Sequence, residues 1–288
     1  MPFFSAEHHN IYYVAVGDRT NPALLILHGF LGSHQDFTHL LPTFSQYFYC
    51  IVPDLPGHGQ TKTQTDSYTF PKTADTLLAL LRCLNIQKTH LLGYSMGGRL
   101  ALHLVCEFPE CFVRVVLESA SPGLRTVEER ARRRVSDGAI AHRLQTTPLP
   151  IFLDQWYRNP LFASLQQYPD KYAAMLRRRE CNKPTELAQA LEGLGTGQQT
   201  SLWNALETLT QPLLLVVGSL DDKFVAINCE MLARAGDGYG CKLEMIENCG
   251  HNLHLEAPTV YACTVLLFLN ESTVFRQYAG LEKVLPEN

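Results

Sequence analysis

The sequence lacks the features that define several large classes of protein. Its nine cysteines are odd in number and include no C-x-x-C pair, which argues against a disulfide framework and against a structural zinc site. No apolar run approaches the length that spans a bilayer, and the N-terminus lacks a basic region followed by a long apolar stretch. We therefore expect a cytoplasmic protein with reduced thiols and no membrane insertion.

A large excess of charge is also missing. The formal net charge of −4 gives no overall electrostatic reason to expect nucleic acid or an anionic membrane as a partner. The 11 histidines are too dispersed to suggest a metal site. Small-molecule chemistry fits this composition better, and nothing in the sequence requires more than a monomer.

The chain is long enough for one large α/β domain with an insertion. It has 288 residues, of which 46% are hydrophobic. Helical patterns such as 73–84 and 96–108 lie between apolar runs, so strand and helix alternate and the sheet should be largely parallel. The runs that predict strands are 11–16, 23–27, 48–52, 90–92, 113–117, 213–217 and 243–246.

This alternation stops after Ser121 and resumes only near Gln211. We interpret residues 1–120 and 206–288 as the α/β core and residues 121–205 as a helical cap inserted over the active site. The predicted cap holds ten of the sixteen arginines with two lysines and eight acidic residues, so it should attract anions. Most arginines of 130–134 and 177–179 should nevertheless be solvated, because they cannot all face one way on a helix.

The most informative motif is Gly93-Tyr94-Ser95-Met96-Gly97, which lies between an apolar run and a helical pattern. This G-x-S-x-G spacing is typical of a nucleophile elbow, a sharp strand-to-helix turn that needs glycine on both sides of the serine. The turn exposes the hydroxyl of Ser95 and leaves free amide groups at the start of a helix, where developing negative charge is stabilised.

A serine hydroxyl needs a histidine oriented by a carboxylate, and the chain offers both. Asp221 follows the predicted strand 213–217, with Asp222 as its rival. His251 follows the predicted strand 243–246 and a flexible glycine, which favours it over His254. The order Ser95, Asp221, His251 is the order of α/β-hydrolases.

The motif His28-Gly29-Phe30 follows the predicted strand 23–27. We expect the backbone amides of Phe30 and Met96 to form an oxyanion hole. His28 is interpreted as the residue that orders this loop, and His58, in a glycine-rich turn, is interpreted as structural.

These residues resemble the α/β-hydrolase superfamily, and the resemblance narrows to the 2-succinyl-6-hydroxy-2,4-cyclohexadiene-1-carboxylate synthases of menaquinone biosynthesis. It covers roughly residues 20 to 270. Beyond the serine motif, it is carried by His28-Gly29-Phe30, Asp54-Leu55-Pro56-Gly57-His58-Gly59, Arg99, Pro122-Gly123-Leu124, Glu129-Arg130-Ala131, Ser136-Asp137, Trp156-Tyr157, 160–165, Asp221-Asp222-Lys223-Phe224 and Gly250-His251-Asn252.

Such enzymes are lyases that remove pyruvate from 2-succinyl-5-enolpyruvyl-6-hydroxy-3-cyclohexene-1-carboxylate, a tricarboxylate. The resemblance implies that Arg99, Arg133 and Arg177 bind the carboxylates, with neighbouring arginines as alternatives in the two clusters. It implies that Tyr94 and Trp156 shape the pocket around the ring. It further implies proton abstraction by a Ser95 that His251 and Asp221 activate, with no metal or organic cofactor.

Two other functions remain open at this stage. A serine esterase or carbon–carbon bond hydrolase would use the same three residues to form an acyl-enzyme, although a neutral ester gains nothing from converging arginines. A hormone or peptide receptor of this fold would have no need for Asp221. The sequence also leaves open whether the final quinone is menaquinone or phylloquinone, since both pathways share the step.

Overall fold

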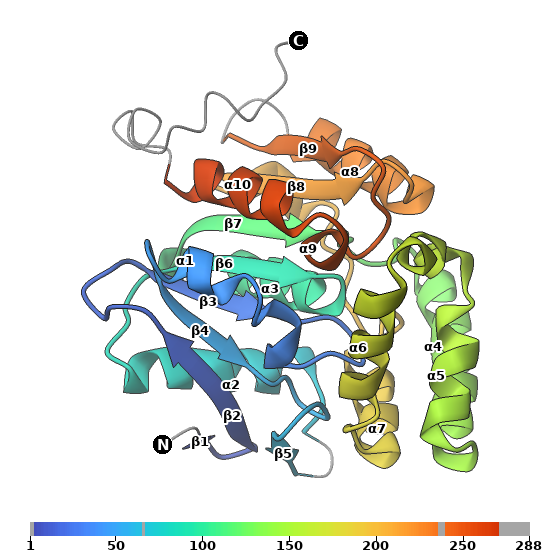
Figure 1. Ribbon diagram of the computed structural model, residues 1–288. Helices are drawn as coiled ribbons and strands as arrows, with labels where there is room; N and C mark the ends of the chain where they lie inside the picture. The colour runs from blue at the N-terminus through green and yellow to red at the C-terminus, as the bar shows by residue number, and fades with distance from the viewer. Residues whose placement is uncertain (1–2, 65–66, 236–239, 271–288) are drawn as a thin grey trace.

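The computed structural model describes residues 3–64, 67–235 and 240–270, so the end of the predicted core at 271–288 lies outside the described residues. Nine strands form one sheet in the order β1-β2-β4-β3-β6-β7-β8-β9, with β5 paired to β2 (Figure 1). All neighbours from β4 to β9 are parallel, as predicted. The strands are β1 (Phe3–Ser5), β2 (His9–Val16), β3 (Ala23–Leu27), β4 (Tyr49–Pro53), β5 (Lys62–Thr63), β6 (Thr89–Tyr94), β7 (Phe112–Glu118), β8 (Leu213–Gly218) and β9 (Lys242–Ile246).

Helices cover both faces of this sheet. Alternate residues of β3 show the arrangement, because Leu25 and Leu27 join one apolar cluster while Leu24 and Ile26 join another. The first cluster contains side chains of α2, α3 and α8, and the second contains side chains of α1 and α10. The helices that flank the sheet are α1 (Leu41–Phe44), α2 (Phe70–Cys83), α3 (Met96–Glu107), α8 (Asp222–Ala235), α9 (Leu253–Glu256) and α10 (Pro258–Leu269).

The stretch between β7 and β8 contains helices and no strand, as the sequence predicted, and every residue of it is described. Figure 1 shows these helices grouped beside the ends of the strands. They are α4 (Val127–Thr146), α5 (Leu149–Tyr157), η3 (Pro160–Gln167), α6 (Pro169–Arg179) and α7 (Pro184–Leu194), and the short helix η4 (Ala205–Thr208) follows them before β8. We call this group the cap helices. Their boundary at residues 121 and 205 as a separate insertion stays a prediction.

The cap helices have an apolar cluster of their own, which also reaches the core. Phe152 and Met175 are fully buried in it, together with Leu31 and Leu255 from the loops of the sheet domain. A capping box at Thr126 and Glu129 fixes the start of α4, since each side chain accepts from the other residue's backbone N–H. The cap is thus packed on the core and does not depend on charge pairs alone. Within the described residues, no helix is both long and apolar enough to cross a membrane.

Candidate active site

Ser95 occupies the turn between β6 and α3, as the glycine spacing predicted. Its backbone has φ 50° and ψ −106°, a left-handed conformation that residues with a side chain rarely adopt. A Cβ on Gly97 would lie 2.3 Å from the carbonyl oxygen of Leu27, and one on Gly93 would lie 2.5 Å from that of Gly97. The tight packing of these glycines therefore holds Ser95 in its strained turn.

The structure brings together the serine, histidine and aspartate that the sequence singled out. His251 Nε2 lies 3.1 Å from Ser95 Oγ, and His251 Nδ1 lies 2.6 Å from Asp221 Oδ2. His251 and Asp221 are buried. With Nδ1–H donating to the carboxylate, Nε2 is left as the acceptor for the serine hydroxyl proton. The arrangement is therefore able to activate Ser95 as a nucleophile or as a base.

Asp222 and His254, the alternatives to Asp221 and His251, do not form these contacts. Asp222 is exposed at the start of α8. His254, in α9, directs Nδ1 at Glu118 Oε1 over 2.7 Å and stacks on Phe37 with ring centroids 4.8 Å apart. The ring nitrogen that faces Ser95 belongs to His251, whereas the ring of His254 is directed at Glu118.

A buried carboxylate that sequence reasoning missed anchors the loop of His251. Glu256 accepts hydrogen bonds from the amides of Gly250 (2.8 Å) and Asn252 (3.2 Å), on either side of the histidine. It also accepts the hydroxyl of Ser164 from η3 over 3.0 Å, which ties the cap to the same loop. The only sequence signal was an acidic residue shortly after the histidine, and nothing in that pattern reveals burial.

Two backbone amides near Ser95 are available to stabilise a negatively charged oxygen. Met96 is the first residue of α3, where an N–H has no acceptor within the helix. In the described part of the chain, the amide of Phe30 also has no hydrogen-bond partner. His28 orders the Phe30 loop, because Nδ1 bonds the carbonyl of Gly29 at 2.8 Å and Nε2 accepts the amide of Leu55 at 2.9 Å.

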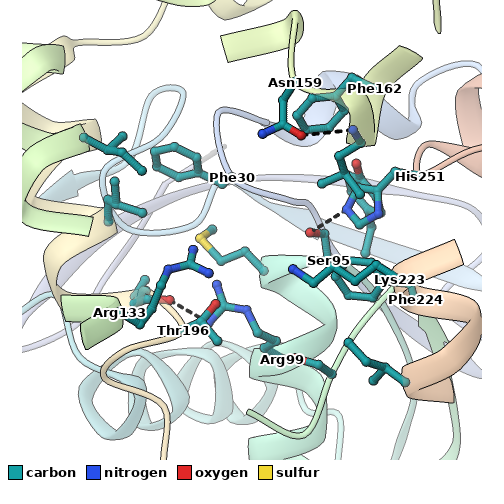
Figure 2. A pocket seen from close by; sticks show the side chains of 18 of the residues that line it. Phe30, Ser95, Arg99, Arg133, Asn159, Phe162, Thr196, Lys223, Phe224 and His251 are labelled. Carbon is teal, nitrogen blue, oxygen red and sulfur yellow. Dashed lines mark hydrogen bonds between the residues drawn. The ribbon is translucent and has the colours of Figure 1, made fainter. Parts of the chain in front are cut away.

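These groups face a cavity of about 450 Å³ between the sheet domain and the cap helices (Figure 2). Its volume is within the range of small-molecule sites. The wall is part aromatic, with Phe30 and Trp156 in edge-to-face contact at 5.5 Å between ring centroids. The other wall residues are Tyr94, Ser95, Met96, Arg99, Ser121, Gly123, Leu124, Arg133, Ser136, Ile140, Tyr157, Asn159, Leu161, Phe162, Arg179, Leu191, Leu194, Thr196, Trp203, Lys223, Phe224, Ile227, His251 and Asn252.

Four of the five predicted substrate-binding residues line this cavity, namely Tyr94, Arg99, Arg133 and Trp156. Arg177 does not, because it is exposed on α6 and lies outside the wall. Arg179 lines the cavity in its place. Successive residues of a helix point about 100° apart, so residues i and i+2, such as Arg177 and Arg179, face in nearly opposite directions. The structure thus places Arg177 outside the wall, and its assignment to substrate binding stays a prediction.

The basic residues of the wall differ in how far their charge is already neutralised. Arg179 is paired with Asp36 at 2.6 Å, and Arg133 with Asp137 at 2.6 Å. Arg99 donates to the carbonyl oxygen of Leu194 at 2.9 Å and has no carboxylate partner among the described residues. Burial and the nearby charge of Arg133 lower the pKa of Arg99. This uncompensated positive charge favours an anionic ligand.

Lys223 is a further basic wall residue to which the sequence analysis gave no role. It lies two residues after Asp221, so its place beside a candidate catalytic carboxylate was the available signal. In the described ranges, no group of three or more histidine, cysteine, aspartate or glutamate side chains is placed to hold a metal ion.

Comparison with known proteins agrees with this geometry. The family described as the alpha/beta hydrolase fold matches residues 22–258. A 2-succinyl-6-hydroxy-2,4-cyclohexadiene-1-carboxylate synthase from Pectobacterium atrosepticum is 33% identical, covering 86% of this chain and 94% of the relative. Another of that name, from Salmonella heidelberg, is 35% identical, covering 82% of this chain and 89% of the relative.

A solved structure gives the same result in three dimensions. MenH from S. aureus superposes with a TM-score of 0.84 at 30% identity, covering 92% of this chain and 99% of that one. Sequence and structure thus agree over most of the length of both chains. This chain belongs to the α/β-hydrolase fold family and, within it, to the family of the 2-succinyl-6-hydroxy-2,4-cyclohexadiene-1-carboxylate synthases.

Proposed function

We propose that the chain is a lyase that eliminates pyruvate from 2-succinyl-5-enolpyruvyl-6-hydroxy-3-cyclohexene-1-carboxylate to give 2-succinyl-6-hydroxy-2,4-cyclohexadiene-1-carboxylate. One observation carries the proposal. The Ser95–His251–Asp221 arrangement opens onto a cavity with basic side chains in its wall, among them Arg99, which has no carboxylate partner in the described part of the chain. A tricarboxylate complements this charge, and the planar arginine fork suits carboxylate binding.

In the proposed reaction, Ser95 acts as the base. Its Oγ takes the proton from the ring carbon next to the succinyl carbonyl, while its own hydroxyl proton passes to His251 Nε2. Asp221 stabilises the resulting imidazolium through Nδ1, as in other serine triads. The electron pair of the broken C–H bond forms an enolate, whose oxygen accepts hydrogen bonds from the amides of Phe30 and Met96.

The second half of the reaction expels the leaving group. The electron pair of the enolate returns to the ring and forms a new carbon–carbon double bond. The existing ring double bond shifts toward the carbon that carries the enolpyruvyl group, and the bond between that carbon and the enolpyruvyl oxygen breaks. The leaving enolpyruvate takes up a proton and becomes pyruvate. No acyl-enzyme forms, so the serine need only come within proton-transfer distance of the substrate.

The cap supports this chemistry by binding and by enclosing the substrate. Arg133 is oriented by Asp137, so its remaining N–H groups are positioned for a carboxylate. Trp156 and Phe30 give the substrate ring an apolar wall, while Tyr94 is fixed through a hydrogen bond from its hydroxyl to Asn252. A cytoplasmic location and a monomeric state stay predictions.

An esterase or carbon–carbon bond hydrolase that works through an acyl-enzyme is the alternative. Supplying the enolpyruvyl substrate and following pyruvate release by wild type and by Ser95→Ala separates the two. We expect rapid release by wild type and a loss of at least about a hundredfold in Ser95→Ala. Rapid hydrolysis of p-nitrophenyl esters by a wild type that releases no pyruvate would contradict the lyase function.

A further inference from the structure

Lys223 brings a positive charge to the immediate surroundings of Ser95. It is the second residue of α8 and lines the cavity. Its Nζ lies 5.3 Å from the ring centroid of Phe224, and that ring lies 4.6 Å from the ring of His251. Figure 2 shows the side chains of Lys223, Arg99 and Arg133 directed toward the space beside Ser95.

This ammonium group has no ion-pair partner in the described ranges. The nearest acidic residue along the chain that faces the site, Asp221, is taken by His251 at 2.6 Å. Lys223 is exposed to solvent at this end of the cavity. Desolvation of the part that faces the cavity and the charge of Arg133 lower the pKa of Lys223, while Asp221 acts in the opposite direction. The charge of Lys223 and that of Arg133, which Asp137 partly offsets, therefore repel each other across the cavity. Such an arrangement is stabilised when an anionic ligand binds.

We propose that Lys223 binds the ring carboxylate of the substrate and thereby determines specificity for the reaction. The assignment rests on the proposed function. In that substrate the ring carboxylate is attached to the carbon next to the one that loses its proton, so it is nearest of the three to the reacting centre. When that centre is over Ser95, the cation beside Ser95 is the one within its reach. Arg99 and Arg133 are left for the other two carboxylates.

The same placement gives Lys223 an effect on the rate. Proton abstraction creates a negatively charged enolate next to a carboxylate that is already negative, and their repulsion raises the barrier. A positive charge between them offsets this repulsion more strongly in the transition state than in the bound substrate. Loss of Lys223 should therefore lower kcat as well as raise KM.

The test compares Lys223→Met with the control variant Lys183→Met. Lys183 is an exposed lysine that pairs with Glu186 at 2.8 Å. We expect kcat/KM for pyruvate release to fall about 10- to 100-fold in Lys223→Met, as for loss of a charged hydrogen bond, and to stay within about twofold in the control. Lys223→Arg should recover part of the loss. Thermal unfolding of each variant checks that the fold is retained, and Lys223→Gln serves as a second neutral variant.

Inhibition by the two products shows whether Lys223 binds the carboxylate that leaves with pyruvate or one of the two, ring and succinyl, that stay on the cyclohexadiene product. The cyclohexadiene product keeps the ring carboxylate, so its inhibition constant should rise about tenfold in Lys223→Met, whereas inhibition by pyruvate should not change. If pyruvate inhibition alone weakens, or if Lys223→Met matches the Lys183→Met control, the inference is overturned while the lyase function stands. A wild type that releases no pyruvate would overturn both.

Discussion

Arg179 of α6 donates a hydrogen bond to Asp36 over 2.6 Å, and each of the two residues is only 2% exposed. Asp36 belongs to the short helix η1 (His34–Phe37) of the sheet domain, so this ion pair joins the cap to the core next to the cavity. Arg179 also donates to the hydroxyl of Tyr157 at 3.2 Å. Burial would raise the pKa of Asp36, but the guanidinium of Arg179 holds it below its usual range.

Asp36→Asn should destabilise the protein, because it leaves the charge of Arg179 buried without its partner. We expect the free energy of unfolding in urea to fall by about 3–5 kcal/mol. The double variant Asp36→Asn/Arg179→Gln should recover part of the loss, because it removes the unpaired charge as well. Arg178→Gln is the control, since its Nε lies 4.0 Å from Asp36 and its side chain is 26% exposed. An Asp36→Asn variant as stable as wild type would mean that the ion pair contributes little.

The sequence was sufficient for the features that depend on short-range patterns. Apolar runs predicted the parallel strands, and glycines around Ser95 predicted the elbow, because both are local consequences of backbone sterics. The edge strands β1 and β5 were missed. They have three and two residues, too few to show a periodic pattern.

The features that depend on side-chain direction or long-range pairing were not predictable. Arg177 and Arg179 belong to the same arginine run, and only the orientation of α6 decides which one reaches the cavity. The pairing of Asp36 with Arg179 was not predictable either, because the two residues lie 143 positions apart in the sequence. Lys223 was part of a recognised motif, but its role depends on the direction in which α8 leaves the sheet.

Arg99→Met should impair the enzyme far more than Arg177→Met. Arg99 lines the cavity and pairs with no carboxylate within residues 3–64, 67–235 and 240–270, whereas Arg177 is exposed and outside the wall. We expect kcat/KM for the tricarboxylate to fall about 10- to 100-fold in Arg99→Met, the range for a lost charged hydrogen bond, and to change less than about twofold in Arg177→Met. Steady-state pyruvate release measures both. Equal losses in the two variants would return Arg177 to the site and imply a different orientation of α6.

Stability should decrease as the pH falls below about 7. Burial lowers the pKa of His9 to about 4, that of His58 to about 3 and that of His90 to about 4. In the unfolded chain these histidines titrate near the ordinary value of about 6.5, so between pH 6.5 and 4 the unfolded state binds about three more protons. The stability that neutral burial contributes is present above pH 6.5 and is lost as the pH falls toward 4.

Urea unfolding at pH 7.5, 6.0 and 5.0 gives the slope, which should approach about 1.4 kcal/mol per pH unit for each histidine. His9 bonds Thr76 at 2.7 Å and the carbonyl oxygen of Ser67 at 3.1 Å. His9→Gln should therefore lower the free energy of unfolding at pH 7.5. It should also reduce the slope by the contribution of one proton, about 1.4 kcal/mol per pH unit. The exposed His142 serves as the control position. A slope close to zero over this range would show that the three side chains accept protons in the folded state.

Two glycine-to-alanine substitutions in helices should have opposite effects. In α3, a Cβ on Gly97 would lie 2.3 Å from the carbonyl oxygen of Leu27 and 2.5 Å from that of His28. Both are backbone atoms where β3 ends and the loop that carries Phe30 begins, so they have no freedom to move without displacing the predicted oxyanion hole. Gly138, in α4, has nothing within 4 Å of a Cβ.

Gly138→Ala should therefore raise the free energy of unfolding by up to about 1 kcal/mol, the difference in helix propensity, and leave pyruvate release unchanged. Gly97→Ala should lower it by about 1–3 kcal/mol through overpacking, despite the same gain in propensity. It should also reduce kcat, because the clash separates α3 from the Phe30 loop and misaligns the two amides. A Gly97→Ala enzyme with wild-type kcat would show that the elbow tolerates this displacement, and that the Phe30 and Met96 amides do not act together on the enolate.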